Sequence, residues 1–201
     1  DFAGGTVVHM TSGWSALLLC IILGPRIGFG KKSMTPHSMV LCAVGTGMLW
    51  VGWYGFNPGS WLSMGPEVPY IAVTTTLGAA GGGIAATLLS QFTGGKPDLT
   101  MTINGILAGL VGVTAGCDGF SMPAAWVVGF ISGIIVVFSV AWIDGLKIDD
   151  PVGAFSVHGT CGIWGTLAVG LFNLDKGLFT GHGFAGKGID GSELRAQIQV
   201  M

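Results

Sequence analysis

The chain has 201 residues, of which 50% are hydrophobic and 9% are charged, and its formal net charge at pH 7 is −2. An average soluble domain carries roughly 25% charged residues, so this composition, with a mean hydropathy of +0.72, excludes an ordinary soluble domain and favours a membrane protein with several helical spans. The sequence shows no basic stripe interleaved with aromatic residues, so we expect no nucleic-acid partner.

Six apolar segments follow one another along the chain. They are too long for barrel strands and lack alternation with a period of two, so they predict helices and an all-α integral membrane protein, a polytopic helical bundle in the cell membrane. The predicted spans are Gly5–Leu23, Met39–Phe56, Tyr70–Phe92, Met101–Ala115, Ala124–Ile143 and Phe155–Phe172. The fourth is short for a ~30 Å hydrocarbon layer, and we expect it to be tilted, half-buried or interrupted.

The connectors between these spans differ in their basic residues. The first, third and fifth contain Lys or Arg, whereas the second and fourth contain neither. The basic residues are Arg26, Lys31, Lys32, Lys96 and Lys147. Short cytoplasmic loops are enriched in Lys and Arg, so the first span is predicted to run from outside to inside and the sixth from inside to outside. Residues 173–201 then form an extracytoplasmic connector.

One motif occurs twice, near opposite ends of the chain. DFAGGTVVH covers Asp1 to His9 and DPVGAFSVH covers Asp150 to His158, and both follow the pattern D-x-x-G-x-x-x-V-H. Eight residues cover ~12 Å of a helix, and the two motifs start from opposite membrane faces, so both histidines are predicted near the midplane. This arrangement is typical of an inverted-topology repeat with a shared central site. Residues 1–23 would be the last helix of a first repeat, and residues 39–172 the second repeat, of a partial transporter domain.

A histidine this deep in a membrane usually faces a bundle interior, pairs with another polar group and marks a pathway. Two alternatives stay open: His9 and His158 are unrelated core residues bonded to backbone carbonyls, or they are metal ligands. A metal site needs further ligands at the same depth, and the sequence shows none, so we expect no metal and no cofactor. Asp1 and Asp150 precede helix starts, where a carboxylate accepts hydrogen bonds from free backbone N–H groups.

The stretch GWYGFNPGSW, from Gly52 to Trp61, ends the second span on the predicted outer side. Aromatic residues there are ordinarily an interfacial anchoring belt, which remains an alternative. However, Trp53, Phe56 and Ser60 also suit a small cation, because ring faces attract cations and a hydroxyl oxygen accepts a hydrogen bond.

Four stretches together resemble one family: the ammonium transporters, methylammonium permeases and Rhesus proteins, in particular its ammonium transporter branch. They are DFAGGTVVH, GWYGFNPGS, GLVGVTAGC (Gly109–Cys117) and DDPVGAFSVHGTCGIWG (Asp149–Gly165). The resemblance covers nearly the whole chain and matches its spans to the fifth to tenth of the family's eleven helices. It implies that His9 and His158 are the paired pore histidines and proton relay.

The resemblance also implies roles for residues outside the histidine pair. Ser60 matches the hydroxyl of the outer ammonium site, and Phe56 matches one of two gating phenylalanines. Trp53, Asn57 and Thr114 match neighbours of the pore and the outer vestibule.

Asp1 matches an acid that maintains the outer site, and Asp150, which begins the second copy of the motif, is expected to give structural support in the same way. The remaining cage tryptophan and gating phenylalanine belong to the family's first half, so these residues alone are not expected to conduct.

The function that follows from the resemblance is ammonium transport, with an ammonium sensor of the same fold as the alternative, and not an enzymatic activity. The substrate would be recruited as ammonium, deprotonated and conducted as ammonia, and methylammonium is a further possible substrate. The implied partners are membrane lipids, two further copies of the chain in a homotrimer, and a cytoplasmic nitrogen-regulatory protein of the PII type.

Overall fold

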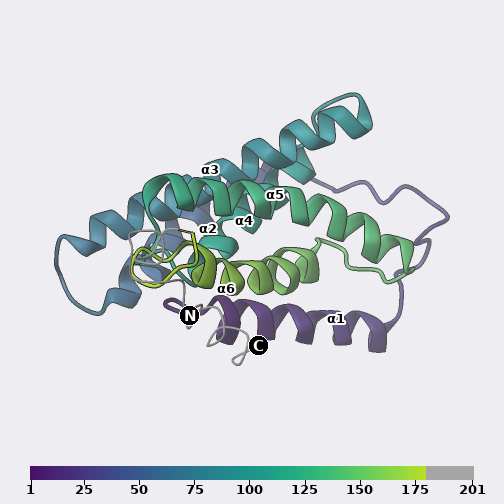
Figure 1. Cartoon of the computed structure of the whole chain (residues 1–201). Coiled ribbons are helices and arrows are strands. Elements are labelled where there is room, and N and C mark those ends of the chain that lie inside the picture. Colours follow the sequence, from purple (N-terminus) through teal and green to yellow (C-terminus); the bar gives the residue numbers. More distant parts are fainter. Residues whose placement is uncertain (180–201) are drawn as a thin grey trace.

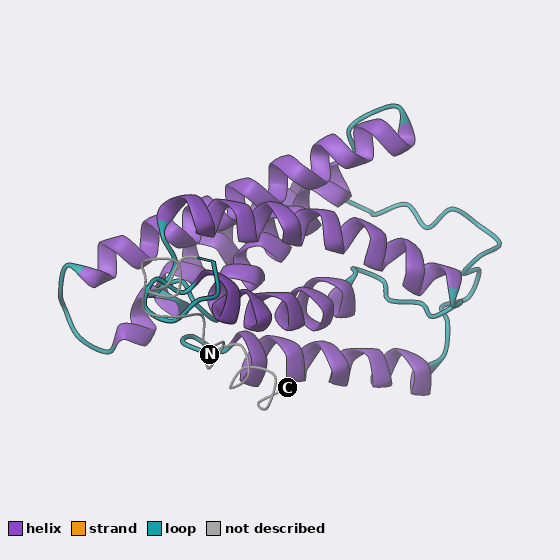
Figure 2. Ribbon diagram, viewed as in Figure 1, coloured by secondary structure: helices purple, strands orange, loops and turns teal. Residues whose placement is uncertain are grey.

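The computed structural model describes residues 1–179, which fold into apolar helices without a β-strand (Figures 1 and 2). The elements in chain order are η1 (Gly5–Met10), α1 (Thr11–Leu23), α2 (Met39–Phe56), η2 (Pro58–Trp61), α3 (Glu67–Gly94), α4 (Leu99–Thr114), α5 (Met122–Gly145), η3 (Phe155–Thr160) and α6 (Cys161–Phe172). Five helical stretches within the described residues are long and apolar enough to cross a membrane, and α4 is a shorter apolar helix. The prediction of an all-α, multi-pass membrane protein is confirmed.

The first, second and sixth predicted spans begin and end at the same residues as the observed helices: η1 with α1, α2, and η3 with α6. The third is longer than predicted, because α3 runs from Glu67 to Gly94. Polar residues near both ends of α3 interrupt the apolar run without breaking the helix, which ends where Gly95 takes the left-handed conformation at φ 74°. Most of the predicted extracytoplasmic connector, residues 180–201, lies outside the described residues.

Three helix starts have the capping side chains that their sequences offer. In each, a side-chain oxygen accepts a hydrogen bond from the backbone N–H three residues later, which satisfies one of the free donors of the first turn. The capping residues are Ser38 for α2, Asp98 for α4 and Ser121 for α5.

The centre of the bundle is formed by α3, α4 and α5, whose backbones approach closely at glycines. A Cβ atom on Gly82 would collide with the carbonyl oxygen of Gly105, and one on Gly109 would collide with the carbonyl oxygen of Gly78. In a membrane, where lipid is as apolar as the side chains, such close contact is the main source of helix association. The glycines therefore build a rigid scaffold behind the histidine-containing helices.

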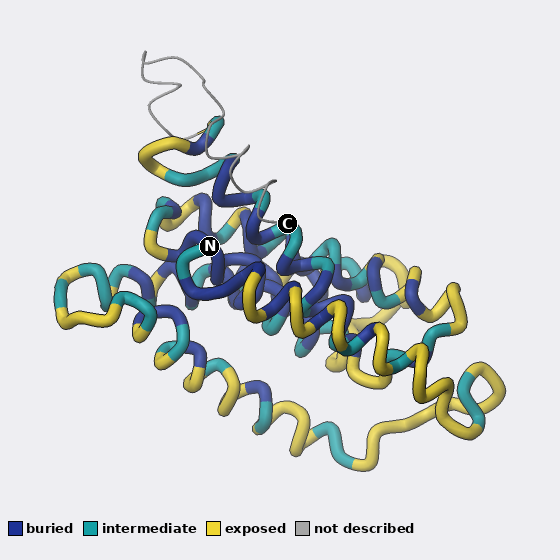
Figure 3. The backbone as a smooth tube through the Cα atoms, turned by 90° about the horizontal axis from the view of Figure 1, so that it is seen from below, coloured by how far each residue is buried: buried dark blue, intermediate teal, exposed yellow. Residues whose placement is uncertain are grey.

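Helix α2 lies at one side of the bundle and is largely exposed, as its yellow turns in Figure 3 show. Within the apolar part of the Met39–Trp61 stretch, 11% of the residues are buried, whereas the corresponding share in the Phe155–Phe172 stretch is 61%. The exposed residues of α1 and α2 are mostly large apolar side chains such as Leu18, Ile22, Val40 and Leu49. These two helices thus present an apolar surface, as lipid or further apolar helices require.

The two copies of the repeated motif lie on helices that run in opposite directions. In Figure 1, α1 leads away from the N-terminus while α6, the green-to-yellow helix beside it, leads back toward the same end. Their first turns, η1 and η3, contact one another. The antiparallel arrangement is the one that an inverted-topology repeat produces.

Candidate functional site

The two motif histidines lie side by side inside the bundle. The Nδ1 atoms of His9 and His158 are 3.1 Å apart, and the ring centroids are 5.1 Å apart with an interplanar angle of 14°. A hydrogen bond between two Nδ1 atoms requires that one ring donates an N–H and the other accepts it. The pair therefore shares one proton between residues 149 positions apart in the chain.

His9 is buried, with 7% of its surface exposed, and its second nitrogen, Nε2, has no hydrogen-bond partner among the described residues. A buried nitrogen without a partner is costly unless another group satisfies it. The arrangement thus leaves one unsatisfied polar atom for a small molecule that can donate or accept a hydrogen bond.

Both histidines sit on π-helical turns, which the sequence did not reveal. The π-helix η1 contains His9 and η3 contains His158. π-Helical turns are rare and are found frequently at functional sites. Because the widened turn shifts the side chains that follow it, it affects where each imidazole points.

The motif aspartates hold the starts of these two turns. The carboxylate of Asp1 accepts hydrogen bonds from the N–H groups of Thr6 and Val7, both at 3.1 Å. The carboxylate of Asp150 accepts from the N–H groups of Ala154 and Phe155, at 2.8 and 2.9 Å. Each copy of the motif thus forms the same device: an acid fixes the turn that presents the histidine.

Two aromatic side chains from α2 complete the surroundings of His9. The Trp53 ring stacks on the imidazole at 5.0 Å and 14°, and Phe56 lies 5.4 Å away at 57°. The Trp53 Nε1–H donates a hydrogen bond to the Thr114 hydroxyl at 3.1 Å. Trp53, His9 and His158 thus form a continuous stack, and Thr114 holds its outer member.

Asn57 directly precedes η2, and Ser60 is the third of its four residues. The Ser60 hydroxyl donates to the Phe56 carbonyl oxygen at 2.6 Å, so its own oxygen remains able to accept. Asn57 is fully buried; its Nδ2 donates to the Thr75 hydroxyl, whereas its Oδ1 has no partner among the described residues. The structure therefore brings His9, His158, Trp53 and Phe56 into one cluster, while Ser60 joins it through the Phe56 backbone and Asn57 contacts α3.

An apolar groove of about 620 Å³ opens beside the cluster. Its wall consists of residues of α2 together with one imidazole. The lining residues are His9, Gly45, Met48, Leu49, Gly52, Trp53 and Phe56. Since aliphatic and aromatic groups offer an ion no hydrogen bonds, this groove disfavours charge next to the histidines.

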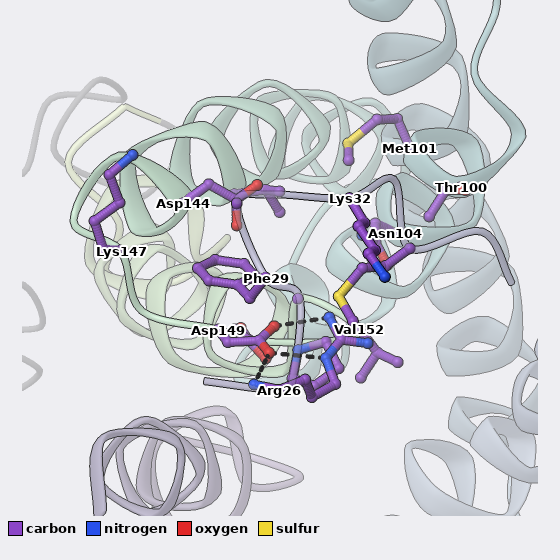
Figure 4. A pocket seen from close by; sticks show the side chains of 16 residues that line it. Arg26, Phe29, Lys32, Thr100, Met101, Asn104, Asp144, Lys147, Asp149 and Val152 are labelled. Carbon is purple, nitrogen blue, oxygen red and sulfur yellow. Dashed lines mark hydrogen bonds and ion pairs between the residues drawn. The ribbon is translucent and has the colours of Figure 1, made fainter. Parts of the chain in front are cut away.

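A second cavity, of about 390 Å³, lies at the end of the bundle that contains most of the basic loop residues (Figure 4). On one wall Arg26 binds Asp149: Nη2 donates to Oδ1 at 2.7 Å, and Nε and the backbone N–H each donate to Oδ2 at 2.8 Å. The guanidinium holds the pKa of the Asp149 carboxyl below its usual range, and the carboxylate raises the pKa of Arg26.

This ion pair joins the connector after α1 to the residue before Asp150, and thus links the two histidine-containing helices at the basic end. Sequence reasoning missed it, because the partners are 123 residues apart and both lie in loops with other charges nearby.

A bundle of apolar helices around an imidazole pair, of which His9 is buried and His158 partly buried, with an apolar groove beside it, defines a multi-pass membrane protein with a polar site in its interior. The sequence matches the Ammonium Transporter Family over residues 1–201. The chain belongs to the ammonium transporter family.

Curated relatives include a putative ammonium transporter of Synechocystis, 47% identical over 184 residues, which cover 86% of this chain and 42% of that protein. An ammonium transporter of Archaeoglobus fulgidus is 42% identical over 178 residues, 86% of this chain and 38% of its own length. The chain therefore spans less than half the length of these relatives.

Solved structures agree with the fold. A structure titled sensor Amt protein superposes with a TM-score of 0.88 at 35% identity and covers 100% of this chain and 50% of its own. Saccharomyces cerevisiae Mep2 superposes with a TM-score of 0.85 at 31% identity, covering 100% of this chain and 47% of its own. The described helices are thus arranged as in about half of an ammonium transporter.

Proposed function

We propose that the full-length protein transports ammonium by recruiting NH4+ on its outer side, removing a proton and conducting NH3 past His9 and His158, while the imidazole pair relays the removed proton separately, so that net transport carries charge. The observation that supports this most strongly is the imidazole pair, joined at 3.1 Å and bordered by an apolar groove. Because one ring carries its proton on Nδ1 and the other on Nε2, the two Nε2 positions offer one acceptor and one donor, which suits a small molecule such as ammonia.

Selectivity follows from the proton that ammonium can lose. Ammonium and potassium are both small monovalent cations, so a ring of carbonyl oxygens would separate them poorly. An apolar wall such as that of Met48, Leu49 and Phe56 instead imposes the full desolvation cost on any ion. Ammonium avoids this cost by leaving a proton behind, whereas potassium cannot.

Recruitment is assigned to the η2 end of α2. The Ser60 oxygen remains free to accept a hydrogen bond from an ammonium N–H, because its own proton is donated to the Phe56 carbonyl. The Phe56 and Trp53 rings attract a cation through their faces. Phe56 also contacts His9, so a cation held at Ser60 would meet this ring before reaching the imidazoles.

The remaining predicted site residues are assigned supporting roles. Thr114 orients Trp53, and Asn57 fastens the end of α2 to α3 through Thr75. Asp1 and Asp150 fix the π-helical turns on which the histidines stand. None of these roles requires direct contact with the substrate.

Assembly is proposed from the family. Residues 1–23 would end one structural repeat and residues 39–172 would form most of the next, with a further half of the protein closing the groove beside His9. A homotrimer surrounded by lipid, methylammonium as a second substrate and a PII-type regulator on the cytoplasmic side complete the proposal.

The test is ammonium-dependent current in liposomes that contain the full-length protein, with potassium as the competitor. Replacing both His9 and His158 with leucine should abolish the ammonium-selective current, while His37→Leu, a control at an exposed loop histidine, should leave it intact. An undiminished and potassium-insensitive current in the double variant would overturn the proposal.

An ammonium sensor is the second candidate, favoured by the similarity to the structure titled sensor Amt protein. A sensor would bind ammonium at the same Ser60 site without carrying sustained flux. Ammonium binding by the purified full-length protein, combined with no current in the liposome assay, would favour the sensor over the transporter.

A further inference from the structure

The histidine pair is bracketed by two places where the η1–α1 and η3–α6 backbones touch. On one side of the pair, a Cβ atom on Gly13 would lie 2.5 Å from the Gly159 Cα and 2.8 Å from the His158 carbonyl carbon, and closer still to the Gly159 nitrogen. On the other side, a Cβ atom on Gly162 would lie 2.9 Å from the Gly5 oxygen and 3.0 Å from the Met10 nitrogen.

These contacts are adjacent to the imidazoles in sequence as well as in space. Gly13 follows His9 by four residues, one helical turn along the same face. On the partner helix, Gly159 directly follows His158, and Gly162 follows it by four residues. The backbones that touch are therefore those to which the two rings are attached.

We propose that Gly13 and Gly162 are positioning residues of the site, whose backbone contacts fix the separation at which His9 and His158 share a proton. A second observation directs the proposal to the histidines rather than to packing in general. The only buried side-chain nitrogen of the described histidines that lacks a partner, Nε2 of His9, belongs to this pair. The contacts thus hold in place a ring that has a free polar atom for a ligand.

The separation tolerates little change. A methyl group on Gly13 must move from 2.5 Å to ordinary contact at 3.4 Å from the Gly159 Cα, a displacement of about 0.9 Å. The Nδ1 atoms are 3.1 Å apart, so transmission of about half of this displacement along the line that joins them is enough to exceed hydrogen-bond range. The same change at Gly162 needs about 0.5 Å, from 2.9 to 3.4 Å, so its effect should be smaller.

The first experiment detects the hydrogen bond without any transport. The full-length protein is labelled with 15N-histidine, and the ring nitrogens are recorded by solid-state NMR. The unaltered protein should show one protonated and one bare Nδ1 in hydrogen-bonded positions for this pair. Gly13→Ala should remove that signature, and Gly162→Ala should weaken it.

The second experiment rests on the proposed function and measures ammonium current per folded protein in liposomes. Misplacing a reacting group by 1 Å costs about 100-fold, so Gly13→Ala should reduce the current by about that factor. Gly162→Ala should reduce it by about tenfold, half the effect on a logarithmic scale. The control is Gly94→Ala, at a helix end with no atom within 4 Å of the new methyl group, which should change neither readout.

The outcomes separate the possibilities. If Gly13→Ala does not fold, Gly162→Ala decides, since its overlap is smaller. An unchanged histidine spectrum in the folded variants would overturn the proposal, as would an equal loss of current in Gly94→Ala. Absence of current in the unaltered protein, with the spectral changes as expected, would reject the transport function and leave the positioning role supported.

Discussion

Replacing Asp149 by asparagine should loosen the connector between α1 and α2 without unfolding the bundle. The carboxylate accepts three N–H groups from Arg26, and its side chain is 2% exposed. The Asp149 carboxylate is covered by this connector at the end of the bundle rather than by the helix core. We therefore expect its loss to cost about 1.5–3 kcal/mol of connector stability, the value for hydrogen bonds to a charged group, rather than the larger value for a deeply buried ion pair.

The magnitude also depends on what is left behind. The Arg26 side chain is 45% exposed, so water can hydrate it once its partner has lost its charge. In Arg26→Gln, by contrast, a covered carboxylate loses its cation. We therefore expect Arg26→Gln to loosen the connector more than Asp149→Asn.

Hydrogen exchange of residues 24–32 in the full-length protein measures this opening, because the Arg26 backbone N–H is itself bonded to Asp149. An equilibrium constant changes tenfold for each 1.4 kcal/mol, so a loss of about 1.5–3 kcal/mol should make amide exchange in Asp149→Asn about 10- to 100-fold faster than in the unaltered protein. Asp144→Asn is the control, since Asp144 lines the same cavity and is not bonded to Arg26 in the described structure. Equal exchange in Asp149→Asn and the unaltered protein, or equal acceleration in the control, would refute the reasoning.

Two further predictions concern the same groups. The pKa of Asp149 is lowered by Arg26, so the carboxylate contributes to stability above the usual carboxyl pKa, and this contribution is lost as the pH falls through the lowered pKa. Amide exchange of the connector, corrected for its intrinsic pH dependence, should therefore accelerate as the pH falls through this window. The same acceleration should be absent in Asp149→Asn. Trp53→Phe removes the donor to the buried Thr114 hydroxyl and should lower stability by about 1 kcal/mol; a double-mutant cycle with Thr114→Val should show less than additive loss in thermal unfolding, whereas additive losses would mean that the bond contributes nothing.

Much of the fold follows from the order of apolar and polar residues. The outer bounds of the first and sixth spans, Gly5–Leu23 and Phe155–Phe172, agree with the structure because Gly and Asp punctuate them clearly. The π-helical turns within both spans were not predicted, since π- and α-helices place apolar residues with nearly the same period.

The site was predictable where a repeat marked it and unpredictable where only distant contacts define it. The matching motifs indicated that His9 and His158 approach the same depth, and the structure places their rings together. The stack of Trp53 on His9 and the ion pair of Arg26 with Asp149 join separate elements, and no local pattern marks either contact. The functional roles assigned to these residues stay predictions until the variants are measured.

A high-resolution structure of the full-length protein in a lipid bilayer tests the central claim most directly. The account predicts that the Nδ1 atoms of His9 and His158 lie within about 3 Å of each other, enclosed on all sides by protein in a narrow apolar passage. Two imidazoles too far apart to share a proton, or rings that face the lipid, would contradict it.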